Sequence, residues 1–261
     1  MRHGAAWGWR WRAAASLLGF GVLLTAGPAR SAPRCVIPTD LTQLEFPLGR
    51  TAHLLAARAP IRIVALGSSS TAGAGASSTA TTYPSRLTAE LSQLFPSQPI
   101  AVFNRGVNGE QVVDMLARFE ASVVAEHPTL VLWQLGTNAV LHDQGSLSNA
   151  LIHEGTTRLK SIAADIILID PQFAPKVIAK PEAAAMVNSI ASAAKLEKID
   201  LFRRFALMRH WRAIEAMPFE TFISADGLHM NDWSYDCLAK ALSAAIAEAA
   251  TRDQNRATAH Q

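Results

Sequence analysis

One aspartate and one histidine near the carboxyl end of the chain have a spacing that suits acid–base chemistry. They lie three positions apart in Asp226-Gly-Leu-His229, the only Asp-x-x-His downstream of residue 32. A carboxylate at this spacing can hold the imidazole in one tautomer, so that the ring takes a proton from a hydroxyl. Three consecutive serines, Ser68, Ser69 and Ser70, follow an apolar run early in the chain. Together the two stretches predict a serine nucleophile with a histidine base, the chemistry of acyl transfer.

Acyl transfer also needs hydrogen-bond donors for the oxyanion that forms when a serine attacks a carbonyl. Gly109 has no side chain to shield its N–H, and Asn138 carries a neutral amide donor. Taken alone, each of these residues is more often a turn or a cap, as are a serine cluster and a loop histidine. Their joint occurrence after successive apolar segments favours one shared site.

The apolar segments that precede these polar clusters are predicted strands. Ile61–Gly67 reads as a buried strand that stops in a small-residue turn. Further strands are predicted at Pro99–Asn104, Thr129–Leu135 and Asp165–Asp170, and the stretch Lys198–Phe205 fits either a short fifth strand or a helix start. Because the carboxyl ends of parallel strands converge at one sheet edge, the polar clusters can share one pocket.

Amphipathic or alanine-rich helices are predicted between and after the strands. They cover Tyr83–Phe95, Glu110–Glu126, Ser146–Ala164, Pro181–Lys198 and Asp232–Ala250, followed by a polar, frayed tail at residues 251–261. This alternation predicts an α/β protein with a mainly parallel sheet and helices on both faces.

The order and spacing of the polar blocks resemble the SGNH hydrolases, also called the GDSL esterase/lipase family, from about Ile61 to Ala250. Gly67 to Thr71 lies over a Gly-Asp-Ser-x-Thr block, and later stretches resemble the Asn-x-x-x-x-Gly, Gly-x-Asn-Asp and Asp-Gly-x-His blocks. The resemblance implies a three-layer α/β/α, flavodoxin-like fold with a mainly parallel five-stranded sheet.

The same resemblance implies a role for each matching residue. Ser69 is the implied nucleophile, His229 the general base and Asp226 its orienting carboxylate. The oxyanion hole is implied to consist of the Ser69 N–H, the Gly109 N–H and the Asn138 side chain.

Two positions depart from the family pattern. Ser68 replaces the acidic residue before the nucleophile, and Ala139 replaces the aspartate after the block-three asparagine. Both positions usually support the site through hydrogen bonds, so the departures bear on rate and loop rigidity. They also leave an alternative function: a protein that retains the pocket and binds a carbohydrate or other ligand, with weak or no catalysis.

The amino terminus has the pattern of a signal peptide. Residues 1–32 have a basic opening, an apolar run too short for a comfortable membrane span, and small residues at the end. The alternative is an uncleaved amphipathic anchor. Export followed by cleavage would give a periplasmic or secreted protein without a stable membrane span. We expect the remaining chain to consist of an amino-terminal arm at 33–60 and one domain at 61–250.

Charge and cysteine content narrow the remaining function classes. Residues 1–31 hold four of the 24 basic residues, which leaves 20 basic against 21 acidic residues downstream and no basic cluster for nucleic acid. Cys35 and Cys237 can pair in an oxidising compartment or remain independent buried thiols. No spacing indicates a metal site, and the expected chemistry needs no cofactor.

The sequence therefore predicts an exported serine esterase. No Gly-x-Gly-x-x-Gly or Gly-Lys-Ser/Thr motif marks a phosphate loop, and no Gly-x-Ser-x-Gly elbow marks an α/β-hydrolase scaffold. The absence of a lid-like amphipathic insertion favours a short acyl group, such as acetyl, on a carbohydrate or small ester. A lipase, a thioesterase or an acyltransferase with the same site remains an alternative.

Overall fold

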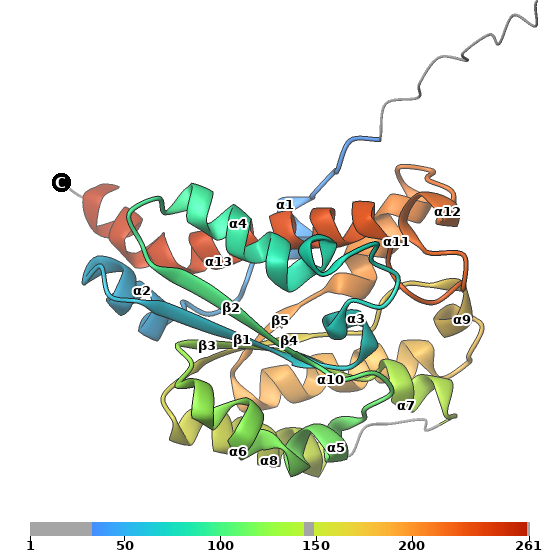
Figure 1. Cartoon of the computed structure of the whole chain (residues 1–261), viewed down its shortest axis with the longest axis horizontal. Coiled ribbons are helices and arrows are strands. Elements are labelled where there is room, and N and C mark those ends of the chain that lie inside the picture. The colour runs from blue at the N-terminus through green and yellow to red at the C-terminus, as the bar shows by residue number, and fades with distance from the viewer. Residues whose placement is uncertain (1–32, 144–148, 260–261) are drawn as a thin grey trace, which may run out of the picture. The chain divides into compact units, whose positions relative to one another are not determined.

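Five strands build one sheet in which every neighbouring pair is parallel (Figure 1). The structure, a computed structural model, describes residues 33–143 and 149–259. The strands are β1 Ile61–Gly67, β2 Ile100–Gly106, β3 Leu130–Gln134, β4 Asp165–Ile169 and β5 Asp200–Phe202, in the order β2-β1-β3-β4-β5. This confirms the predicted parallel five-stranded sheet. The stretch Lys198–Phe205, which had two interpretations, contains β5 and then the start of a helix at Arg204.

Helices cover both faces of the sheet, which confirms the predicted three-layer α/β/α fold. Helices α4 (Tyr83–Leu94) and α13 (Asp232–Ala259) lie on one face, and α8 (Asn149–Ser161) and α10 (Ala183–Glu197) lie on the other (Figure 1). The other helices are α1 Thr39–Thr42, α2 Gly49–Ala56, α3 Ser69–Ala72, α5 Val112–Ala117, α6 Phe119–Ser122, α7 Thr137–Leu141, α9 Pro175–Ile178, α11 Arg204–Ala213 and α12 Phe219–Phe222, with 3₁₀ turns at Thr79–Thr81 and Val124–Glu126.

The central strands are buried on both faces, because helices lie above and below them. Every residue of β3 is buried, and in β1 only Arg62 is partly exposed. Strands buried on both faces consist of continuous runs of apolar residues in the sequence. That is why their positions could be predicted closely from the sequence.

Two of the predicted helices differ most from the structure. The single helix predicted at 110–126 is broken, because Arg118 leaves helical geometry with φ −106° and ψ 15° between α5 and α6. Its guanidinium instead donates to the Glu110 carboxylate and, over 2.8 Å, to the Arg105 carbonyl at the end of β2. Helix α13 runs to Ala259 through the predicted frayed tail, a stretch without glycine or proline.

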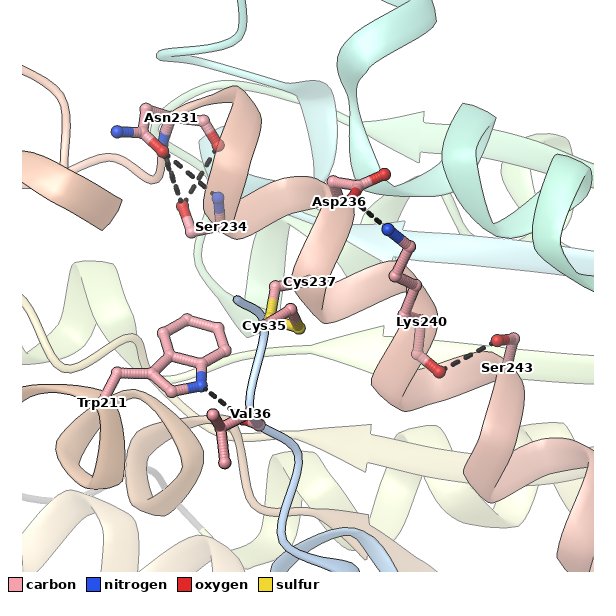
Figure 2. The surroundings of a disulfide bond; sticks show 9 residues. All are labelled: Cys35, Val36, Trp211, Asn231, Ser234, Asp236, Cys237, Lys240 and Ser243. Carbon is pink, nitrogen blue, oxygen red and sulfur yellow. Dashed lines mark hydrogen bonds and ion pairs between the residues drawn. A yellow bond between two sulfur atoms is a disulfide. The ribbon is translucent and has the colours of Figure 1, made fainter. Parts of the chain in front are cut away.

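The amino-terminal arm is fastened to the domain at several points. The Trp211 indole donates to the Val36 carbonyl over 2.9 Å, and a disulfide joins Cys35 to Cys237 of α13 (Figure 2). Of the two sequence interpretations of these cysteines, the structure shows the disulfide. The predicted signal peptide at 1–32 lies outside the described residues. None of the helices in the described part is apolar over a length that would cross a membrane.

We expect loss of the disulfide to lower stability, because it joins residues 202 positions apart and so restricts the unfolded chain. Cys35→Ala should lower the free energy of unfolding by about 2–5 kcal/mol in urea titrations. Cys35→Ala/Cys237→Ala is the matched control, and dithiothreitol should destabilise the parent chain but not this double variant. An unchanged midpoint in Cys35→Ala would contradict a bond between the two cysteines.

Candidate active site

The predicted nucleophile stands where the central strand meets its first helix. Ser69 is the first residue of α3, directly after β1 and Ser68, and only 8% of its surface is exposed. The Ser69 Oγ lies 2.9 Å from the His229 Nε2. Because the first N–H groups of a helix have no intrahelical acceptor, the Ser69 N–H is also free of the helix ladder.

The histidine is held by a tight loop between α12 and α13. The His229 Nδ1 lies 2.5 Å from the Asp226 Oδ2, so the ring has one partner on each nitrogen. The other carboxylate oxygen of Asp226 accepts bonds from the Ser224 hydroxyl and from the Leu228 and His229 amides, over 2.7 to 2.9 Å. Gly227 has a φ of +69°, which closes this turn at little steric cost.

These hydrogen bonds keep the Asp226 carboxylate ionised. Burial raises the pKa of Asp226, but the bonds from the His229 backbone and side chain, the Leu228 amide and the Ser224 hydroxyl outweigh it. The pKa therefore lies well below its usual range. An ionised carboxylate at this distance holds the proton on His229 Nδ1 and leaves Nε2 to accept one from Ser69.

The other two predicted oxyanion donors, Asn138 and Gly109, lie on two further segments. Asn138 is the second residue of α7, is 9% exposed and donates one amide hydrogen to the Glu110 carbonyl over 2.7 Å. Its second amide hydrogen takes no part in this bond. Gly109 lies in an exposed turn after β2 with a φ of +81°, and an added Cβ there would meet no heavy atom within 4 Å.

The structure thus brings Ser69, His229 and Asp226 into one chain of hydrogen bonds. Asn138 lies beside the nucleophile turn: together with Ser68 and Glu110 it lines one small cavity of about 10 Å³. Gly109 lies in the turn that leads to Glu110. The roles of all five predicted site residues remain predictions.

A residue that sequence reasoning missed supports the nucleophile turn. Gln134, at the end of β3 and 1% exposed, accepts three bonds on its Oε1. They come from the Ser68 amide at 2.9 Å, the Ser68 hydroxyl at 3.1 Å and the Thr71 hydroxyl at 3.2 Å. The turn is therefore fastened although Ser68 carries no carboxylate. The available signal was an amide within an otherwise apolar strand.

The glycine before the serines has a steric reason. A Cβ at Gly67 would lie 2.2 Å from the Thr71 Oγ1 and 2.8 Å from the Gln134 Oε1.

The second departure from the family pattern, Ala139, is 2% exposed and belongs to the apolar core. Across 33–143 and 149–259, no group of three or more His, Cys, Asp or Glu side chains is arranged to hold a metal ion.

Comparison with protein families gives one match over most of the chain. The Non-GDSL lipase-like family matches residues 34–252. Among curated protein sequences, none matches the chain.

Solved structures with the same fold include esterases and an acylhydrolase. A two-domain esterase active on acetylated mannans, co-crystallised with mannopentaose, has 16% identity and a TM-score of 0.68 over 83% of this chain. This chain spans 58% of that esterase's length. The lipase/acylhydrolase from Enterococcus faecalis has 22% identity and a TM-score of 0.57, over 71% of this chain and 95% of its own. An acetyl xylan esterase variant from Geobacillus stearothermophilus has 19% identity and a TM-score of 0.58, over 71% of this chain and 94% of its own.

The depressed pKa of Asp226 predicts how its contribution to stability depends on pH. Folding favours the ionised form, so this contribution is present above the unfolded pKa of about 4 and is lost as the pH falls below it. Asp226→Asn should therefore be less stable than the parent at pH 7, and the difference should shrink at pH 3. Urea titrations at both pH values measure it. A difference of equal size at both would show that the charge is not responsible.

Proposed function

Because the chain belongs to the Non-GDSL lipase-like family, we propose that it is a serine esterase that hydrolyses carboxylic esters. The observation that carries the proposal is the chain of hydrogen bonds from Ser69 through His229 to Asp226. This is the geometry that a serine nucleophile needs: a base within reach of its hydroxyl and an ionised group that orients the base.

In the first half of the reaction, His229 Nε2 takes the proton of the Ser69 hydroxyl while Oγ attacks the ester carbonyl. The carbonyl oxygen becomes an oxyanion, and the Ser69 N–H, the Gly109 N–H and the Asn138 amide donate to it. Asp226 stabilises the imidazolium that forms. Collapse of the intermediate breaks the bond to the alcohol, which leaves with the proton from His229.

In the second half, water replaces the alcohol. His229 takes a proton from the water, which attacks the acyl-enzyme carbonyl, and the same three donors stabilise the second oxyanion. Collapse returns the proton to the Ser69 oxygen and releases the carboxylic acid. Every step uses the ester, water, and side chains and backbone N–H groups of this chain, so atoms and charge balance without a further reactant.

We propose acetyl or another short acyl group on a carbohydrate as the substrate. Two solved structures with the same fold support this choice, since one is an esterase active on acetylated mannans and the other is a variant of an acetyl xylan esterase. The proposal extends to export, which the Cys35–Cys237 disulfide supports, because such bonds persist in oxidising compartments. A periplasmic or secreted enzyme would meet envelope or extracellular polysaccharide.

Hydrolysis of p-nitrophenyl esters from acetate to palmitate tests the proposal. We expect the parent chain to prefer acetate and Ser69→Ala to lose at least about 10³-fold in kcat/KM, because the variant lacks the hydroxyl that is hydrogen-bonded to His229 Nε2. Ser192→Ala, an exposed serine on α10, is the matched control and should keep the parent rate. Inactivity of the parent on every ester would favour a ligand-binding protein, and a preference for long chains would favour a lipase.

A further inference from the structure

Beneath the nucleophile turn lies a fully buried guanidinium, that of Arg204, the first residue of α11. Its three nitrogens all donate hydrogen bonds. Nε donates to the Asp170 carbonyl over 2.9 Å, Nη1 to the Ser70 hydroxyl over 3.1 Å and Nη2 to the Gln172 Oε1 over 3.1 Å. One side chain therefore joins the segment after β4 to the residue next to the predicted nucleophile.

Gln172, also fully buried, carries the connection to the other parts of the site. Its Oε1 accepts a second bond, from the Thr137 hydroxyl over 2.9 Å, and its Nε2 donates to the Leu228 carbonyl over 3.3 Å. Thr137 directly precedes Asn138, and Leu228 directly precedes His229. The amide of Gln172 thus bridges the oxyanion segment and the histidine loop.

Stability alone gives a poor reason for this arrangement. Burying a guanidinium costs free energy unless its partners compensate the lost hydration, and an apolar side chain would fill the space without that cost. The acceptors of Arg204 are a carbonyl, a hydroxyl and an amide, and none of the ion pairs among the described residues includes it.

The carboxylate of Asp170, the acidic group that acts most strongly on the Arg204 charge, makes no direct bond to the guanidinium. Asp170 is 1% exposed, and its carboxylate accepts the Phe205 amide over 2.8 Å rather than the guanidinium. Burial raises the pKa of Asp170 to about 7, although the Phe205 amide and the Arg204 charge act against the rise. All direct hydrogen bonds of the guanidinium therefore go to neutral acceptors, and the Asp170 charge favours the cation without a direct bond to it.

We propose that Arg204 and Gln172 are positioning residues that hold Ser69, Asn138 and His229 in register. The proposal rests on the esterase function, because it assigns the two residues a role in that reaction. They touch neither substrate nor reacting atoms; they act through Ser70, Thr137 and Leu228, each a direct neighbour of a site residue. A shift of about 1 Å in such a geometry can cost roughly 10²-fold in rate.

The test compares variants that remove hydrogen bonds at constant size. Gln172→Met removes the bonds to Arg204, Thr137 and Leu228, and Thr137→Val removes only one of them. With p-nitrophenyl acetate we expect kcat to fall roughly 10-fold to 100-fold in Gln172→Met and less in Thr137→Val. KM should change less than threefold, because the substrate contacts remain.

Thr51→Val is the matched structural control. Thr51 is also buried, 2% exposed, and its hydroxyl donates to Asp165 at the opposite end of β4 over 2.7 Å. It should lower the melting temperature about as much as Thr137→Val but leave kcat at the parent value. If Thr51→Val and Thr137→Val lower kcat equally, or Gln172→Met keeps the parent kcat, the positioning role is wrong.

Arg204→Lys tests the buried cation directly. Lysine keeps the charge but lacks the planar fork of donors, so we expect a folded variant with kcat at least tenfold lower. If Arg204→Lys does not fold, Gln172→Met and Thr137→Val still test the positioning role. Ser69→Ala separates the two proposals: an inactive parent refutes the esterase, and an active Ser69→Ala refutes Ser69 as its nucleophile. An active parent with inactive Ser69→Ala and fully active Gln172→Met refutes only the positioning role.

Discussion

The hydrogen bond between the Ser69 hydroxyl and His229 Nε2 joins residues that are 160 positions apart, and it constrains much of the fold. The serine must stand at the end of a central strand, which requires β1 between two parallel neighbours. The histidine must arrive from the loop before α13, which is fastened to the amino-terminal arm by a disulfide. A small movement of either segment would break the contact.

Polar groups buried beneath the site hold these segments together. Gln134 fastens the nucleophile turn from β3, while Gln172 and Arg204 connect the turn to α7 and the histidine loop. Because unpaired polar groups are costly when buried, each of these bonds favours one arrangement of the loops over others. The chain lacks two acidic residues of the family pattern, and at Ser68 an amide from a neighbouring strand makes the contacts that hold the turn.

Much of this architecture could be predicted from the sequence, and what escaped prediction has a physical cause. Continuous apolar runs marked β1 and β3, and the resemblance to the SGNH hydrolases is confirmed by the family match and the fold. Arg204 and Gln134 were missed because their partners lie 32 to 134 positions away and no local spacing links them. The break at Arg118 was missed because its side chain binds the end of β2, a tertiary contact that the helical pattern of residues 110–126 does not reveal.

The most direct test of the central claim is covalent labelling with a fluorophosphonate, followed by mass spectrometry of the tryptic peptides. The reagent forms a stable bond with a serine that a histidine activates. We predict one adduct per chain, on Ser69, and its loss in His229→Ala. An adduct on Ser68 or Ser70, or no adduct on folded protein, would contradict the assignment of Ser69 as the nucleophile.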